Sequence, residues 1–150
     1  PVSSDLPLVI DPSGVYFRPE TGGRLLVGRS FDDDPHAFDF TWDRDRFFTG
    51  IWPILAHRVP ACEAGRLERG WAGLYDMNVV DQTAILGEHP EVRGLFCITG
   101  FSGHGLQQAP AAARGLAELI ATGTFQGLDL SALTPARFAT GALLREDAVI

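Results

Sequence analysis

Gly100–Gly105 (GFSGHG) has three glycines within six residues and lies between an apolar run and a helical pattern. The run before it, Leu95–Thr99 (LFCIT), is typical of a strand buried on both faces. The segment after it, Leu106–Thr122, predicts a helix that tolerates Pro110 in its first turn and ends at Gly123. Such an arrangement can present backbone N–H groups and a helix N-terminus to a ligand. It fits equally a tight turn that packs a helix onto a sheet, and the residues alone leave both alternatives open.

The composition excludes several classes of protein. At 150 residues the chain has about the length of one domain, with the 45% hydrophobic and 21% charged residues usual for globular proteins. Its net charge of −7 argues against a nucleic-acid-binding protein, and no apolar run approaches the roughly 20 residues of a membrane span. All twelve basic residues are arginine, so no lysine can form a Schiff base. Cys62 and Cys97 are too few for a disulfide framework, and we expect both thiols to be unreactive.

Short runs of β-branched, aromatic and aliphatic residues, separated by turn residues, predict an antiparallel sheet. Its expected strands are Leu6–Ile10, Val15–Arg18, Arg24–Gly28 and the long Arg66–Val80. Helical spacing predicts helices over Asp43–Arg58, with an interruption at Pro53, and over Thr134–Phe138. Ser30–Phe40 is expected to be a loop, and its Asp32–Asp34 run lacks the oxygen spacing of a calcium site, so no metal is expected. The predicted fold class is α+β.

Four longer segments and the tail carry a more specific pattern. They are GVYFRPE (14–20), WAGLYDMN (71–78), DQTAILGEHP (81–90), GFSGHGLQQAP (100–110) and DLSALTPARF onward to Ile150. In this order they resemble the C-terminal part of the D-amino-acid-oxidase superfamily, which includes sarcosine oxidase, glycine oxidase and dimethylglycine dehydrogenase. Within this superfamily, the chain resembles the branch of FAD-dependent oxidoreductase domain-containing proteins tied to mitochondrial complex I assembly, and their bacterial relatives. The resemblance covers essentially the whole chain.

The resemblance implies a FAD cofactor and a division of the chain between two domains. Residues 1–94 would form part of a substrate domain with an antiparallel sheet, and residues 95–150 would provide the terminal strand and helix of the flavin domain. Members of the family carry a dinucleotide-binding unit with a G-x-G-x-x-G fingerprint at the N-terminus, and no such fingerprint occurs here. We therefore expect a C-terminal portion, which begins at Pro1 without an initiator Met and which alone is inactive and binds FAD weakly or not at all.

The resemblance also assigns site residues. Main-chain groups of one loop would contact the flavin, from Gly100, Phe101, Ser102, Gly103, His104, Gly105 and Leu106. The helix dipole beginning near Leu106 would favour negative charge on the reduced flavin. Tyr75 and Asp76 would face the flavin, and Tyr75 and His104 are the candidate catalytic residues. Gln107, Tyr75 and Arg29 are the candidate substrate contacts. Plainer roles stay open: His104 as a structural hydrogen-bonding residue, Tyr75 as a half-buried strand residue, and Arg29 as a surface or ion-pair residue.

Three positions depart from the pattern of sarcosine oxidase. Gln107 stands where that enzyme has a lysine that helps to hold the substrate carboxylate, so this anchoring is weakened. Gly73 stands where it has a flavin-linking cysteine, so the resemblance implies a non-covalent flavin. Leu26 falls near its oxygen-activating lysine, and a leucine cannot stabilise the charge that develops on reduced oxygen. The third departure favours a dehydrogenase over an oxidase.

The resemblance therefore implies that the full-length protein oxidises the C–N bond of a secondary or tertiary amine, similar to an N-methyl amino acid. The alternative is a non-catalytic assembly or interaction protein that retains the fold. The expected partners are a small-molecule amine and an unknown electron acceptor, with no nucleic acid and no membrane span. Without its N-terminal part the chain would expose an apolar face, so it could form a homodimer. The lack of a signal peptide and the low cysteine content predict a cytoplasmic location, or a mitochondrial one in a eukaryote.

Overall fold

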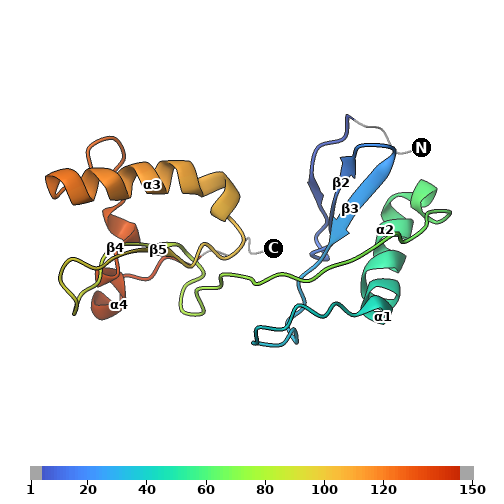
Figure 1. Ribbon diagram of the computed structural model, residues 1–150, viewed down its shortest axis with the longest axis horizontal. Helices are drawn as coiled ribbons and strands as arrows, with labels where there is room; N and C mark the ends of the chain where they lie inside the picture. The colour runs from blue at the N-terminus through green and yellow to red at the C-terminus, as the bar shows by residue number, and fades with distance from the viewer. Residues whose placement is uncertain (1–4, 146–150) are drawn as a thin grey trace. The chain divides into compact units, whose positions relative to one another are not determined.

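The computed structural model describes residues 5–145, so the first four residues and the end of the tail, 146–150, lie outside the described part. The chain forms two compact units, the first ending at Leu74 and the second beginning at Tyr75 (Figure 1). Each unit has its own small antiparallel sheet and its own helices, which is the α+β mixture that the sequence predicts. The assignment of 1–94 and 95–150 to a substrate and a flavin domain stays a prediction. Among the described residues, no helix is long and apolar enough to cross a membrane.

The first unit begins with the predicted antiparallel meander. Its strands, in sheet order, are β1 (Val9–Ile10), β2 (Tyr16–Glu20) and β3 (Arg24–Gly28). The Asp11 carboxylate shapes the turn after β1, because it accepts a hydrogen bond from the Ser13 N–H at 2.9 Å. Gly14 follows with a φ of +84°, which glycine adopts without strain. The three strands are therefore confirmed, with β1 shorter than its apolar run indicates.

The predicted helix after the loop forms with a widened turn in its middle. The Asp43 carboxylate caps the short helix α1 (Arg44–Arg46), accepting a hydrogen bond from the Asp45 N–H at 2.8 Å. A π-helical turn (Phe47–Ile51) then joins α1 to α2 (Trp52–Arg58). Pro53 lies at the start of α2, where its ring would crowd a carbonyl of an ordinary preceding turn. The wider π turn relieves this crowding, so the helix and its interruption at Pro53 are both confirmed.

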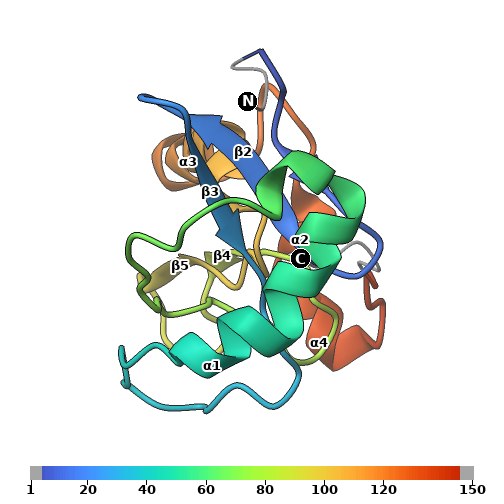
Figure 2. The ribbon, with the colours of Figure 1, turned by 90° about the vertical axis from the view of Figure 1, so that its right-hand side faces the viewer.

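Helix α2 lies beside the sheet of the first unit (Figure 2). A small apolar core joins the helix to the sheet. Phe17, Leu55 and Cys62 are buried at its centre. Partly buried hydrophobic residues surround them: Leu6, Val9, Leu25, Val27 and Val59. Burial raises the pKa of the Cys62 thiol, so this cysteine stays protonated and is unreactive, as the sequence predicts.

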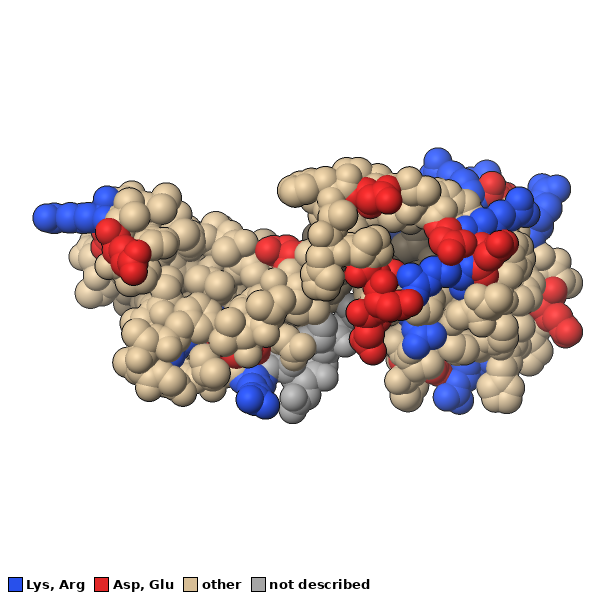
Figure 3. Space-filling model, turned by 90° about the horizontal axis from the view of Figure 1, so that it is seen from below, with Lys and Arg blue, Asp and Glu red and all other residues tan. Residues whose placement is uncertain are grey.

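Charged side chains gather on the first unit, whereas the second unit has a largely uncharged face in Figure 3. Arg46 forms ion pairs with Asp33 and Asp34 of the loop 30–40. These two carboxylates therefore have a cationic partner within the first unit. Both units expose apolar side chains, among them Phe38 at 88% in the first unit and Leu106 at 92% in the second. Such exposed residues agree with the expectation that an isolated chain would self-associate, and the homodimer stays a prediction.

The expectation of a long strand over Arg66–Val80 is wrong. This segment pairs with no strand, and the sheet of the first unit ends with β3. A strand needs a neighbour for its backbone hydrogen bonds, whereas a side chain, the Trp42 indole, lies against the backbone of Gly70. A Cβ atom on Gly70 would come within 2.6 Å of this ring, so the glycine permits the close approach. Alternating polarity alone does not distinguish such an extended connection from a strand.

The second unit has a two-stranded antiparallel sheet that supports the long helix α3 (Gly105–Thr122). Strand β4 (Ile85–Glu88), which the sequence analysis missed, pairs with β5 (Phe96–Thr99). Leu86 of β4 is fully buried, and α3 contacts both strands. The strand predicted at Leu95–Thr99 is confirmed, but burial on both of its faces is wrong. Ile98 and Thr99 are exposed, because β5 belongs to a sheet of only two strands.

The helix α3 ends as the sequence predicts and starts one residue earlier. Gly123 forms its C-cap with a φ of +80°, in the left-handed conformation. Because α3 begins at Gly105, Pro110 lies in its second turn and not in its first. Proline has no N–H, so the Leu106 carbonyl receives no helical hydrogen bond from residue 110. A 3-10 turn (Ser131–Leu133) and the short helix α4 (Ala136–Thr140) follow, close to the predicted terminal helix.

A buried ion pair joins the segment before β4 to α4. Asp81 is 2% exposed and Arg137 is 3% exposed. The guanidinium donates from Nε to Oδ2 of Asp81 at 2.6 Å and from Nη2 to Oδ1 at 3.0 Å, a bidentate arrangement. It also donates to the carbonyls of Thr83 at 2.9 Å and Leu133 at 2.6 Å. Both charges are therefore fully hydrogen-bonded inside the second unit.

Removing the buried cation should destabilise the second unit only. We expect Arg137→Met to lower its stability by about 3–5 kcal/mol, because the Asp81 charge would stay buried without its partner. Circular dichroism at 222 nm reports mainly α3, and the fluorescence of Trp42, Trp52 and Trp71 reports the first unit. In urea titrations, the midpoint of the dichroism signal should shift to lower urea concentration, and the midpoint of the tryptophan fluorescence should not change.

The matched control is Arg114→Gln, which removes an exposed arginine from α3 and breaks its ion pair with Glu118. Its cost should stay below about 1 kcal/mol. A dichroism midpoint for Arg137→Met equal to that of Arg114→Gln would contradict the structural role of the buried pair.

Acid should weaken the same unit. Hydrogen bonds from Arg137 lower the pKa of Asp81 from 3.8 to about 2, so the folded state resists its protonation. The stabilisation, about 2 kcal/mol, is complete above the unfolded pKa of 3.8 and is lost as the pH falls toward 2. We expect the urea midpoint measured by dichroism to fall over this range, and to fall less steeply in Asp81→Asn. Equal slopes in the two proteins would show that Asp81 does not cause the decline.

Candidate functional site

The candidate site is the loop between β5 and α3, which turns sharply through left-handed backbone. Gly100, Ser102 and Gly103 have φ values of +69°, +48° and +93°. Ser102 is not a glycine, and two hydrogen bonds hold its side chain in this conformation. Its Oγ accepts from the Asn78 N–H at 3.0 Å and donates to the Gly100 carbonyl at 3.2 Å. Ser102 is fully buried, so this side chain belongs to the interior of the loop.

The Asp76 carboxylate fastens the beginning of the loop. Its Oδ2 accepts hydrogen bonds from the Gly100 N–H at 2.6 Å and the Phe101 N–H at 3.4 Å. Its Oδ1 accepts from the Thr99 hydroxyl at 3.1 Å. The backbone carbonyl of Asp76 accepts from the Ser102 N–H at 2.9 Å. One residue therefore binds four consecutive residues that lie more than twenty positions further along the chain.

These bonds decide which N–H groups of the loop can meet a ligand. Gly100, Phe101 and Ser102 donate to Asp76, and His104 donates to the Phe101 carbonyl at 3.0 Å. The N–H groups of Gly103, Gly105 and Leu106 take part in none of these bonds. A helix leaves its first N–H groups without helical acceptors, and His104, the N-cap of α3, supplies no side-chain acceptor. The donors that this loop can offer therefore lie at Gly103 and at the start of α3.

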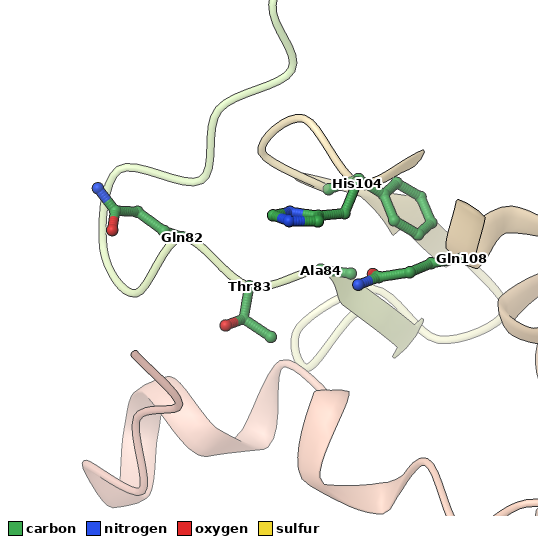
Figure 4. A pocket seen from close by; sticks show the side chains of 6 residues that line it. Gln82, Thr83, Ala84, His104 and Gln108 are labelled. Carbon is green, nitrogen blue, oxygen red and sulfur yellow. The ribbon is translucent and has the colours of Figure 1, made fainter. Parts of the chain in front are cut away.

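His104 and Gln108 extend toward a small pocket on the second unit (Figure 4). The lining residues come from the loop, from α3 and from the segment before β4: Gln82, Thr83, Ala84, Phe101, His104 and Gln108. Its volume of about 20 Å³ has room for roughly one water molecule. Ligand pockets usually measure about 300–1,000 Å³, so this pocket is no substrate cavity by itself.

The structure brings Tyr75 to the loop. Gly103 lies so close to the Tyr75 hydroxyl that a Cβ atom on Gly103 would overlap it. Tyr75 is 40% exposed, so its ring can contact both the loop and a ligand. Gln107 lies in the first turn of α3 with an exposed side chain. The structure thus places Tyr75, His104 and Gln107 at or beside one loop, and their chemical roles stay predictions.

Arg29, the remaining candidate, belongs to the first unit. Its guanidinium donates to the Gly50 carbonyl at 3.1 Å and lies over the Phe31 ring at 4.7 Å from the centroid. These contacts tie the end of β3 to the π-helical turn and to the loop 30–40. They describe a structural role, and substrate binding by Arg29 stays a prediction.

The role of Asn78 and the way in which Asp76 acts were not predicted from the sequence. Asn78 donates from Nδ2 to Oδ1 of Asp81 at 2.6 Å and to the Thr83 carbonyl at 2.7 Å. It therefore connects the loop to the buried ion pair. The signal for these residues was the presence of three polar side chains, Asp76, Asn78 and Asp81, within the short segment YDMNVVD. The described residues contain no group of three potential metal ligands.

Comparison with known proteins identifies the family. A family model described as FAD dependent oxidoreductase, abbreviated DAO, matches residues 1–119. The chain belongs to this family. The FAD-dependent oxidoreductase domain-containing protein 1 of Xenopus laevis is 48% identical over 137 residues, covering 89% of this chain and 28% of that protein. The protein of the same name from Bos taurus is 43% identical over 149 residues, covering 97% of this chain and 31% of that protein.

A more distant relative carries the name of an enzyme. Glycine oxidase from Geobacillus kaustophilus is 32% identical over 115 residues, covering 75% of this chain and 29% of the enzyme. No solved structure gives a significant match. The chain spans about 30% of the length of these relatives. The expected membership in the D-amino-acid-oxidase superfamily is therefore confirmed for a chain that matches one part of its relatives.

The loop fits a flavin at one edge. An isoalloxazine ring has electron-rich carbonyl and nitrogen atoms, which accept hydrogen bonds and become more negative on reduction. The N–H groups at Gly103 and at the start of α3, which have no acceptor among the described residues, suit such atoms, and α3 with its 18 residues adds a favourable dipole. The pyrophosphate of FAD needs a different helix N-terminus, of the dinucleotide-binding type, and the sequence has no fingerprint for it.

The close approach of Tyr75 should make Gly103 intolerant of a side chain. Gly103→Ala combines strain at a φ of +93° with a clash against the Tyr75 hydroxyl. Gly94→Ala is the matched control, since Gly94 has a φ of +81° and no atom lies within 4 Å of an added Cβ. We expect about 1 kcal/mol of destabilisation for Gly94→Ala and at least about 2 kcal/mol for Gly103→Ala. Equal losses in urea titrations followed by dichroism would mean that Tyr75 does not pack on Gly103.

Proposed function

We propose that the full-length protein containing this chain binds FAD non-covalently and oxidises the C–N bond of a secondary or tertiary amine, similar to an N-methyl amino acid. The observation that carries the proposal is the loop 100–106 in a member of the FAD dependent oxidoreductase family. Its bonds to Asp76 turn the N–H groups of Gly100 and Phe101 inward and leave those of Gly103, Gly105 and Leu106 for the cofactor. The glycine oxidase relative supports an amine as the substrate class.

In this proposal the protein positions the substrate and stabilises charge. FAD, when bound, supplies the acceptor for a hydride from the carbon next to the amine nitrogen. The substrate loses the hydride as an uncharged amine and becomes an iminium ion, so no strong base is required. The N-terminus of α3 would stabilise negative charge at the edge of the ring that it faces. Tyr75 and Gln107 would orient the amine by hydrogen bonding, and His104 stays the candidate for proton transfer.

Electrons would then pass to an acceptor other than oxygen. Leu26, which stands near the oxygen-activating lysine of sarcosine oxidase, is a half-buried residue of β3. Its cross-strand partner is Arg18, whose guanidinium is paired with Glu20 at 2.5 Å. Arg18 is therefore already paired with a carboxylate. A position without an unpaired cation supports a dehydrogenase.

The first test compares the full-length protein with residues 1–150 after incubation with FAD and gel filtration. We expect flavin absorption at about 370 and 450 nm in the full-length protein alone, because the pyrophosphate site lies outside this sequence. The flavin of the full-length protein should then be bleached anaerobically by an N-methyl amino acid and reoxidised faster by an artificial acceptor than by oxygen.

The other outcomes each contradict a separate part of the proposal. Flavin retained by residues 1–150 would contradict the need for a further nucleotide-binding unit. Fast reoxidation by oxygen would indicate an oxidase. Absence of flavin from both proteins would support the non-catalytic interaction role, and gel filtration of the shorter chain would also show whether it dimerises.

A further inference from the structure

We propose that Asp76 is the positioning residue of the cofactor loop: its carboxylate holds the amides of Gly100 and Phe101 so that the later N–H groups of the loop face the flavin. The inference rests on the proposed function, because it assumes that the loop contacts FAD. Asp76 lies outside the loop 100–106 and would influence flavin binding by fixing the backbone conformation of the loop. Asp76 would also place a fixed negative charge behind the loop.

The contacts of Asp76 are those of a clamp. A single carboxylate accepts from two successive amides and from the Thr99 hydroxyl, with the shortest bond, from Gly100, at 2.6 Å. Hydrogen bonds to a charged acceptor are stronger than those between neutral groups. Gly100 is buried, whereas Asp76 and Thr99 are exposed. The carboxylate thus keeps its own hydration while it satisfies the amides at the point where the chain leaves β5.

The clamp acts at the residue where the loop becomes left-handed. Gly100 has a φ of +69°, which reverses the direction of the following amides relative to a continued strand. The bond from its N–H to Asp76 fixes this reversal on one side, and the bond from the Ser102 N–H to the Asp76 carbonyl fixes it on the other. Without the carboxylate, the Phe101 amide would be free to compete for a ligand with those of Gly103 and Gly105, and the buried Gly100 amide would lose its acceptor.

The charge of Asp76 has a separate consequence. A carboxylate close to the loop opposes the accumulation of negative charge on a ring that the loop contacts. It therefore counteracts the dipole of α3, which favours such charge. Removing the charge while keeping the shape should make the reduction potential of the bound flavin more positive. Purely structural support would not predict this change.

The test uses the full-length protein with three substitutions. Asp76→Asn keeps the size and one acceptor oxygen but removes the charge, Asp76→Ala removes the clamp, and Thr99→Val removes only the hydroxyl donor. We expect the dissociation constant for FAD to rise at least tenfold in Asp76→Ala and less than threefold in Thr99→Val. The flavin potential should become more positive in Asp76→Asn and stay unchanged in Thr99→Val.

Hydrogen exchange at residue resolution provides a readout that does not need the cofactor. In Asp76→Ala, the amides of Gly100 and Phe101 should exchange at least tenfold faster than in the unsubstituted protein. In Asp76→Asn, which keeps one neutral acceptor oxygen, the same two amides should exchange faster by a smaller factor, because a neutral acceptor binds an amide less strongly than a carboxylate does. The Ser102 amide is an internal control, because its acceptor is the Asp76 backbone carbonyl, which both substitutions retain. Equal acceleration at all three amides would show general unfolding of the loop and would overturn a specific clamp.

The outcomes separate this inference from the proposed function. If the unsubstituted protein binds FAD and Asp76→Ala binds it equally well with an unchanged potential, the inference fails and the proposed function stands. If the unsubstituted protein retains no FAD, the proposed function fails, and with it the role of Asp76 toward a flavin. Hydrogen exchange then still shows whether Asp76 holds the loop. Should Asp76→Ala not fold, the potential and exchange rates of Asp76→Asn decide the question.

Discussion

The buried pair of Asp81 and Arg137 is the interaction on which the second unit depends. Neither charge could stay inside without the other, since each would lose its hydration without compensation. The pair forces the segment before β4, the helix α4 and the residues near Leu144 to meet, because the Leu144 N–H also donates to Asp81 at 3.2 Å. Asn78 extends this network to the candidate loop. Charged and polar contacts therefore connect Leu144, in the tail of the chain, to the loop.

The loop reaches its left-handed backbone conformation in two different ways. Its left-handed turns at Gly100 and Gly103 come from glycine, whereas Ser102 achieves the same geometry through two side-chain hydrogen bonds. The Asp76 carboxylate accepts the hydrogen bonds of the Gly100 and Phe101 amides, and α3 begins a few residues later, at Gly105. The resemblance to flavin enzymes predicts that main-chain groups of residues 100–106 contact the cofactor, and this contact stays a prediction. Within the chain, the N–H groups of Gly100, Phe101, Ser102 and His104 already have acceptors.

Local patterns predicted the elements whose stability is local. The strand Arg24–Gly28 and the end of α3 at Gly123 agree with the sequence analysis, since turn glycines and capping act within a few residues. The long strand over Arg66–Val80 failed because a strand depends on a distant partner, which this segment lacks. Strand β4 was missed for a related reason. It contains Gly87, which resembles a turn residue in sequence and has a φ of +138° against Thr134 and Pro135.

In the candidate site, too, the local features were predictable from the sequence and the long-range contacts were not. Its glycines were visible in the sequence, but the bonds from Asp76 span more than twenty residues and the bond from Arg137 to Asp81 spans 56. Bonds over such separations leave no periodic signal. A loop already held by its own chain loses little conformational freedom when a ligand arrives, so more of each new contact contributes to affinity. Amides fixed in advance would also discriminate between ring edges, because they cannot rearrange to suit a poorer acceptor.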